Sequence, residues 1–170
     1  MTYMEIPVDR SIDEKIIWAD NCFDRYKKTF LKDKETAQLL KKLQEASAQS
    51  LKEMIETGLV DECRKCEEEE GGACCGAGIE NRYSGTLLLI NLLLGIKLPA
   101  KAPDAKSCFF LSPGGCILRA RHVICVNYIC RKITDRIPGR MLNHLREKEG
   151  KELDTLFMLN ERIKFILRDL

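Results

Sequence analysis

Nine cysteines in a chain of 170 residues constrain this sequence more than any other feature. Eight of them fall between residues 63 and 130, and only Cys22 lies outside that interval. Free cysteine packs like a small apolar residue, so thiols that merely fill a core would be spread along the chain. The clustering therefore favours metal coordination, and we expect Cys22 to be a packing residue. A disulfide framework and scattered buried thiols are the alternatives.

The first four clustered cysteines lie in the stretch DECRKCEEEEGGACCG, residues 61–76. The spacing of Cys63 and Cys66 allows a tight turn to point both sulfurs at one ion, although redox dithiols use the same spacing. Cys74 and Cys75 are adjacent in sequence, and adjacent side chains usually diverge. We therefore expect this pair to bridge a polynuclear centre or to divide between two sites. The flanking glycines allow close approach of the backbone.

The other four clustered cysteines are Cys108, Cys116, Cys125 and Cys130. The sequence SPGG between the first two predicts a turn that brings Cys108 and Cys116 together. An unbroken helix would place Cys125 and Cys130 about 140° apart around its axis, so we do not expect one there. Eight thiolates are enough for two tetrahedral sites, or for one cluster with additional ligands.

Charge is distributed unevenly around these cysteines. Residues 61–75 hold six acidic and two basic residues, a net charge of −4, whereas residues 97–136 hold eight basic and two acidic residues, a net charge of +6. A divalent ion with four thiolates carries about −2, so nearby cations stabilise it. The bases that we expect to supply this positive charge are Arg119, Arg121, Arg131 and Lys132. Few aromatic residues are interleaved with these bases, which argues against nucleic-acid binding.

The four consecutive glutamates, Glu67 to Glu70, would repel thiolates beside them. We therefore expect this run to project into water as a solvated loop. The alternative is that one of these carboxylates supplies an oxygen ligand to a harder metal such as iron.

Helical periodicity is clear in the first third of the chain. Residues 12–30 repeat apolar side chains at spacings of three and four, behind a capping box formed by Ser11 and Glu14. A second helix is expected over residues 34–57, with Gly58 as its stop.

The remainder of the chain alternates between helical and irregular sequence. Ser84 caps a third expected helix, which runs through Leu94, is nearly apolar all round and is therefore buried. Between residues 98 and 115, three prolines and a Gly-Gly indicate an irregular connection. The helical pattern returns after Pro138, and Gly150 is expected to mark a break or kink within it.

Together these patterns predict an all-α fold in which helices at both ends surround an irregular, cysteine-rich, metal-binding middle. We expect one domain over residues 1–170, with N-terminal helices in 1–60, a cysteine-cluster region in 61–132 and one or more C-terminal helices in 138–170. The longest apolar run, residues 87–96, is too short to span a bilayer, and the N-terminus does not read as a secretory signal. A cytoplasmic protein without membrane contact is the expectation.

Few residues suggest catalysis. His122, three residues before Cys125, is a candidate ligand or hydrogen-bond donor to a ligand, whereas His144 is expected to be a surface or packing residue. Three further residues are candidate hydrogen-bond partners of the thiolates: Tyr83, Asn127 and Tyr128. The sequence contains neither GxGxxG nor GxxxxGK[ST], and no catalytic residue can be assigned.

The cysteines, taken in order, resemble the YkgJ-type cysteine-cluster family, described as a zinc- or iron-chelating domain. Cys63 and Cys66 match the first pair of the family pattern, and GACCG matches its Cys-Cys block. The remaining blocks are CFFL with Cys108, GGCIL with Cys116, and RHVICVNYIC with Cys125 and Cys130. The glutamate insertion lengthens the first part of the pattern. The resemblance implies that all eight cysteines bind metal.

Two functions follow from these observations. The first is a protein that binds iron, as an iron–sulfur cluster or related centre, for redox chemistry or electron transfer with a partner protein. The second is a zinc-stabilised structural or protein-interaction module without catalytic activity. A thiol switch, in which metal release allows disulfides to form, is a third alternative.

Overall fold

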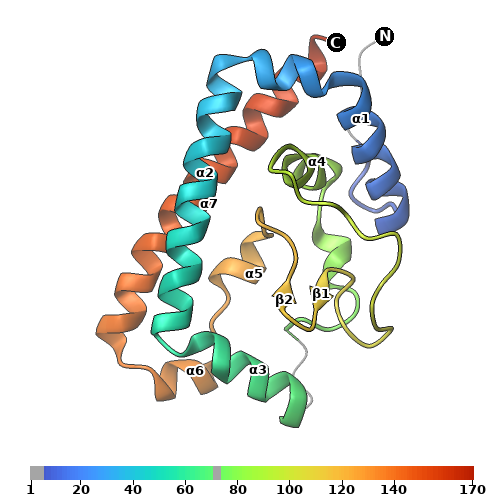
Figure 1. The fold of residues 1–170 in the computed structure, drawn as a ribbon. Helices are drawn as coiled ribbons and strands as arrows, with labels where there is room; N and C mark the ends of the chain where they lie inside the picture. The colour runs from blue at the N-terminus through green and yellow to red at the C-terminus, as the bar shows by residue number, and fades with distance from the viewer. Residues whose placement is uncertain (1–5, 71–73) are drawn as a thin grey trace.

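The computed structural model describes residues 6–70 and 74–170. It is predominantly helical, which confirms the predicted all-α class, with one two-stranded sheet in the described part of the chain (Figure 1). In chain order the elements are α1 (Ile12–Lys32), α2 (Lys34–Glu56), α3 (Leu59–Glu70), the 3-10 turn η1 (Ile79–Arg82), α4 (Gly85–Leu93), β1 (Leu111–Ser112), β2 (Gly115–Cys116), α5 (Val123–Asn127), α6 (Arg131–Arg136) and α7 (Gly139–Arg168). Among these described helices, none combines the length and the apolar character needed to cross a membrane.

The first two helices begin and end close to the predicted residues. Ser11 and Glu14 form the capping box of α1, with the Ser11 N–H donating to the Glu14 carboxylate at 3.0 Å. Asp33 ends α1 and also caps α2, where its carboxylate accepts from the Thr36 N–H at 2.8 Å. Gly58 follows α2 with a φ of +77°, a left-handed conformation that glycine adopts readily.

Helices α2 and α7 lie antiparallel along one side of the molecule (Figure 1). Polar side-chain contacts join them near opposite ends. The Arg162 guanidinium contacts the Asp33 carboxylate at 3.0 and 2.5 Å, and His144 Nδ1 lies 2.9 Å from Glu53 Oε1. The Arg162 hydrogen bond is the main reason why the pKa of Asp33 lies well below its usual range.

Helix α7 runs through Gly150 without interruption, so the predicted break at this residue is wrong. A glycine inside a helix costs only about 1 kcal/mol relative to alanine. That cost is outweighed because apolar residues at helical spacing are buried on both sides of it: Leu145, Leu156, Leu159, Ile163 and Leu167. The hydrophobic stripe therefore determines the extent of α7.

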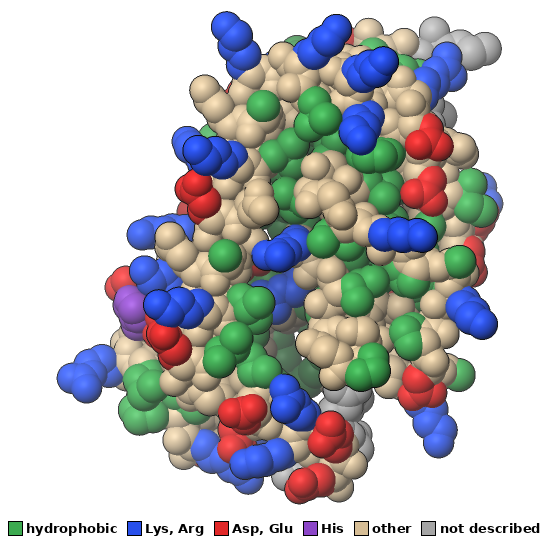
Figure 2. All heavy atoms as spheres, viewed as in Figure 1, with side chains coloured by type: hydrophobic (Ala, Val, Ile, Leu, Met, Phe, Trp, Pro, Cys, Tyr) green, Lys and Arg blue, Asp and Glu red, His purple; other side chains and the backbone are tan. Residues whose placement is uncertain are grey.

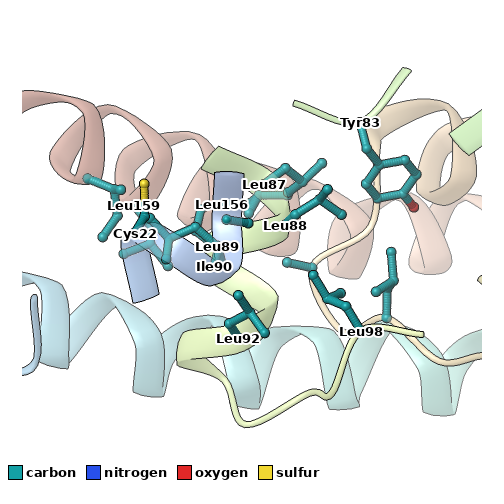
Figure 3. Close-up of a cluster of buried hydrophobic side chains, with 14 of the residues drawn as sticks. Cys22, Tyr83, Leu87, Leu88, Leu89, Ile90, Leu92, Leu98, Leu156 and Leu159 are labelled. Carbon is teal, nitrogen blue, oxygen red and sulfur yellow. The ribbon is translucent and has the colours of Figure 1, made fainter. Parts of the chain in front are cut away.

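The main core forms around α4, which is buried from Gly85 to Leu92 as its uniformly apolar sequence predicts. Figure 3 shows leucines of α4 beside Cys22 of α1 and beside Leu156 and Leu159 of α7. Cys22 is completely buried in this core, which agrees with its predicted packing role. A Cβ atom on Gly85 would lie 2.6 Å from the Trp18 ring, so only glycine allows α1 to approach so closely.

Candidate metal centre

Helix α3 carries Cys63 and Cys66, so this pair does not lie in the tight turn expected from its spacing. The same helix includes Glu67 to Glu70, and the prediction of a loop for this run is wrong. Glutamate, lysine and arginine all favour helices, and Leu59 is buried at the start of α3. Glu68 and Glu69 are exposed, whereas the Glu67 and Glu70 side chains and residues 71–73, including the glycines before the Cys-Cys pair, lie outside the described residues.

Residues three apart in a helix point to the same side, so Cys63 and Cys66 still face one region. The pKa of Cys63 is raised to about 11, chiefly by burial and in part by charge repulsion from three other thiols, namely Cys74, Cys130 and Cys66. The Cys63 residue is exposed overall, but protein atoms around the sulfur still remove part of its hydration.

Packing between α3 and α6 explains why Cys130 lies near residues so far away in sequence. A small apolar cluster brings residues of α2, α3, α6 and α7 together: Met54, Leu59, Ile133, Ile137 and Leu145. Arg136 of α6 also forms an ion pair with Glu62 of α3, next to Cys63. Cys130 immediately precedes α6, so the docking of α6 brings its thiol towards α3.

Cys74 belongs to the same neighbourhood. Burial raises its pKa, and the charges of Cys130 and Cys66 act in the same direction. The interaction of charges weakens with distance, so these effects place the four thiols in one region, although they are not close enough together to form a ready ligand set in the described structure. We refer to Cys63, Cys66, Cys74 and Cys130 as the α3 thiol group.

A second set of thiols gathers around the hairpin of β1 and β2. The Cys108 N–H donates to the Cys75 carbonyl at 2.6 Å, beside an isolated bridge between Gly76 and Ser107. The predicted turn at SPGG is present and joins Leu111–Ser112 to Gly115–Cys116. It returns the chain so that Cys116 lies near Cys108.

The pKa values of these thiols are raised by burial and by the charges of nearby thiols. Burial raises the pKa of Cys108 to about 11, and the charges of Cys116 and Cys125 contribute. Burial also raises the pKa of Cys116, with a further contribution from Cys125. We refer to Cys108, Cys116 and Cys125 as the hairpin thiol group, which Cys75 adjoins through its backbone.

The two groups are themselves neighbours, because the charge of Cys125 acts on Cys74. Cys130, the last of the eight in sequence, therefore lies in the region of Cys63 and Cys74. The helix is interrupted between Cys125 and Cys130, as predicted, by Tyr128 and Ile129. None of the nine cysteines forms a disulfide in the described chain.

In residues 6–70 and 74–170, no three Cys, His, Asp or Glu side chains are close enough together to form a ready metal site. The donors nevertheless suit zinc or iron, because both metals accept clustered thiolates. Crowded thiols also repel one another when ionised, and a cation among them would relieve that repulsion. The chemistry of the donor set therefore fits a thiolate-bound metal.

Tyr83, one of the three predicted hydrogen-bond partners, contacts a thiol directly. Its phenol donates to Cys125 Sγ at 3.7 Å and accepts from the His122 N–H at 3.1 Å. Burial and the charge of Cys125 raise the pKa of Tyr83, which keeps the phenol protonated and able to donate. Asn127 instead accepts from Arg146, and Tyr128 is exposed.

His122 caps α5 in this structure. Its Nδ1 atom accepts from the Ile124 N–H at 3.2 Å, so the neutral ring carries its proton on Nε2. Burial and Arg82 lower its pKa, which favours this neutral form. His144 pairs with Glu53, in line with its expected surface role.

Of the four bases expected to support the thiolates, Arg121 has a clear effect. Its positive charge lowers the pKa of Cys116, opposing the rise caused by burial. Its guanidinium also lies 3.8 Å from the buried Glu152 carboxylate. Arg131 is exposed and pairs with Asp135, and no contact places it against a thiol in the described structure. Figure 2 shows hydrophobic and basic side chains around a hollow on the face between α2 and the hairpin.

Asn91 positions the thiol segments, a role that the sequence analysis missed. It is completely buried in α4, where its amide group donates to the Ala120 carbonyl at 2.8 Å. Its carbonyl accepts from the Arg119 and Ala120 N–H groups at 2.9 and 3.0 Å. These bonds fix the chain between Cys116 and Cys125. The sequence signal was a single amide in an otherwise apolar helix.

Lys15 is a second residue that the sequence analysis missed. Its side chain is completely buried and donates to the Asn81 carbonyl at 2.9 Å. Burial lowers the pKa of Lys15. The bond ties α1 to η1, directly before Tyr83. The sequence signal was a lysine on the apolar face of the predicted helix 12–30.

Comparisons of this chain with models of protein families, with curated proteins and with solved structures found no significant match.

Proposed function

We propose that this protein binds zinc or iron through Cys63, Cys66, Cys74, Cys75, Cys108, Cys116, Cys125 and Cys130, as its resemblance to the YkgJ-type cysteine-cluster family implies. The observation that carries this proposal is the convergence of thiols from separate segments. Helix α3, the Cys74 segment and the start of α6 contribute to one group, and the hairpin and α5 contribute to the next. Most of these thiols are at least partly exposed and repel one another, unlike thiols that only fill a core.

The grouping leads to a definite division of ligands. The α3 thiol group would hold one metal through Cys63, Cys66, Cys74 and Cys130. The hairpin thiol group would hold the other, with Cys75 as the fourth ligand because its carbonyl bonds the Cys108 N–H. In this arrangement the adjacent cysteines Cys74 and Cys75 serve different sites, in keeping with the divergence of neighbouring side chains.

A bound metal would supply redox chemistry if it is iron, as a cluster or related centre, and folding energy if it is zinc. The surrounding residues would act on the thiolates in either case. The Tyr83 phenol donates towards Cys125, and Arg121 provides positive charge near Cys116. The Arg121 charge favours the ionised, metal-binding form of Cys116, and the Tyr83 hydrogen bond would orient the Cys125 sulfur.

A zinc-stabilised structural or interaction module is the second candidate, and the packing of α3 favours it. The apolar cluster that holds α3 is small, whereas the core around α4 is several times larger. A structural metal would add the stability that this region does not obtain from apolar burial.

Elemental mass spectrometry on untagged protein purified without oxygen, with its visible spectrum, tests the proposal. About two zinc ions per chain and no visible absorption would support structural sites. Iron with acid-labile sulfide and a broad band near ~400 nm would support a redox centre. Absence of both metals from the folded protein would overturn the proposal.

The division of ligands has its own test. Cys63→Ser should remove metal from the α3 thiol group, and Cys125→Ser should remove it from the hairpin thiol group. Each variant should therefore lose about half of the metal, and the double variant should lose nearly all of it. The control is Cys22→Ala, judged by metal content alone because this residue lies in the core. Equal and complete loss in both single variants would contradict two separable sites.

A further inference from the structure

A cleft of about 470 Å³ opens between the start of α4, the start of α5 and the middle of α7. Its volume lies within the range of pockets that hold small molecules. The thiols do not line it, but His122 does, and the Tyr83 phenol connects the backbone of His122 to Cys125. The cleft is therefore a separate surface beside the candidate metal centre.

One part of the cleft is apolar. Leu87 of α4, Val123 of α5 and Phe157 of α7 all line it. Phe157 is 67 % exposed and Val123 is 48 % exposed, although both are large apolar side chains. A single exposed apolar residue is ordinary, but here two from different helices border the same cleft. An apolar molecule in the cleft would cover both of them.

Two hydrogen-bond donors lie together at another part of the lining. Arg82 is exposed and makes no ion pair with any residue of the described chain. It lines the same cleft as His122. Because His122 Nδ1 already accepts from the Ile124 N–H, Nε2–H is the donor that remains available in the neutral ring.

In the described structure the lining has two other charged residues, and neither offers an anion the same donors as Arg82 and His122. The Arg121 guanidinium is already engaged, since it lies 3.8 Å from the Glu152 carboxylate and contacts the Met54 sulfur at 3.5 Å. Asp154 of α7 is the acidic member of the lining and would oppose an anion. Arg82 is therefore the basic group of the lining that we assign to an anion.

From this combination we propose that the cleft binds a small organic carboxylate with an apolar body. The carboxylate would accept from the Arg82 guanidinium and His122 Nε2–H, and the apolar body would contact Val123 and Phe157. An Arg guanidinium forms strong charge-assisted bonds with a carboxylate, and the apolar wall adds hydrophobic burial. This site does not depend on the identity of the metal.

Isothermal titration calorimetry on the full chain with 3-phenylpropionate as the probe tests this proposal. We expect saturable binding of one molecule per chain. Acetate, which lacks the apolar body, and 3-phenylpropanol, which lacks the charge, should each bind at least about 10-fold more weakly, a difference of about 1.4 kcal/mol. Absence of saturable binding at millimolar probe, or equal binding of the alcohol, would overturn the proposal.

Variants then locate the site. Arg82→Gln and Phe157→Ala should each weaken binding of 3-phenylpropionate about 10-fold or more, whereas Asp154→Asn should strengthen it by removing a repulsive charge. Arg140→Gln, at an exposed position of α7 outside the cleft, is the matched control and should leave binding unchanged. Arg82 and Phe157 are exposed, so their replacement should not unfold the protein, which circular dichroism can verify.

Three results of this series would reject the site. One is that Arg82→Gln and Arg140→Gln have the same effect. Another is that phenylalanine binds more tightly than 3-phenylpropionate and loses that advantage in Asp154→Asn, which would indicate a zwitterion site instead. The third is that binding survives Phe157→Ala undiminished. Metal content, measured in parallel, should stay constant in every variant, so failure here is distinguishable from failure of the metal proposal.

Discussion

The helical scaffold and the thiol region of this protein are stabilised in different ways. The scaffold, α1, α2, α4 and α7, surrounds one large apolar core in which α4 is buried almost completely. The thiol region, α3, the hairpin, α5 and α6, is itself divided. The hairpin segment places Phe109, Phe110 and Leu118 in the main core, whereas α3 and α6 share a small apolar cluster with α2 and α7 and are joined by the Glu62–Arg136 ion pair. The comparison teaches that hydrophobic burial holds the frame and the hairpin, whereas α3 depends more on polar contacts and, in our proposal, on metal.

Metal removal should produce the largest difference between the two regions. After treatment with a chelator, we expect amides of α3 to exchange with solvent at least about 1,000-fold faster, because structural zinc contributes on the order of 10 kcal/mol to small metal-dependent folds. Amides of α4 and the middle of α7 should keep their protection, since apolar packing holds them. Hydrogen exchange read by mass spectrometry measures both. Uniform loss of protection would show that the two regions are not independent.

A cavity in the scaffold should lower the stability of the protein without changing the amount of metal bound. Leu159→Ala removes a completely buried side chain from the core and should lower the free energy of unfolding by about 2–5 kcal/mol. Met158→Ala, at the neighbouring but exposed position, should change it by less than about 0.5 kcal/mol. Denaturant titration measures both variants. The metal bound per folded molecule should stay the same, and a large fall in it would contradict the separation of roles.

Asn91 connects the two regions, so its replacement should affect both of them. In Asn91→Leu the backbone groups of Arg119 and Ala120 lose their partners, and each buried orphan costs about 1–3 kcal/mol. We expect lower stability together with weaker metal retention in a competition titration with a chelator. Leu92→Met, a change of shape in the same helix, is the control. Unchanged metal retention in Asn91→Leu would show that the Cys116–Cys125 segment is held by other contacts.

The smallest effect on stability should come from the ion pair between Asp33 and Arg162 at the end of the scaffold. The pKa of Asp33 is lowered in the folded protein, chiefly by its hydrogen bond with Arg162. Its ionised form therefore stabilises the fold above the unfolded pKa of about 4, and this stabilisation is lost as the pH falls further. Asn also caps helices well, so Asp33→Asn removes mainly the charge.

The difference in stability between the wild type and Asp33→Asn should accordingly be about 1 kcal/mol or less near pH 7, because the pair is partly exposed. It should shrink as the pH falls below about 4. Thermal unfolding at a series of pH values measures it. A difference that grows towards acid would contradict the lowered pKa.

The sequence was sufficient for the scaffold because local signals agree there with tertiary packing. The capping box at Ser11, the stop at Gly58 and the apolar α4 all lie where the pattern predicts. Gly150 misled the prediction because a local cost of about 1 kcal/mol is small beside the buried stripe of α7. Glu67 to Glu70 misled it because repulsion from thiolates was given more weight than helix propensity.

The thiol region was predictable in part. The turn between Cys108 and Cys116 could be predicted from SPGG, whereas the choice of the eight cysteines as ligands stays a prediction. The approach of the Cys130 segment to α3 could not be predicted, because it depends on the apolar cluster that includes Leu59 and Ile133 and on the pair between Glu62 and Arg136. Tertiary contacts of this kind leave no local pattern in the sequence.

Asn91 also limits how the scaffold can change. Leucines around α4 can exchange for other apolar residues of similar volume with modest loss. A shift of α4 by one residue, however, would turn Asn91 by about 100° around the helix axis and away from Arg119 and Ala120. The Asn91 amide thus determines the register of a helix whose other side chains are mostly apolar. A redesign of this core would have to keep Asn91 while the surrounding apolar residues were varied.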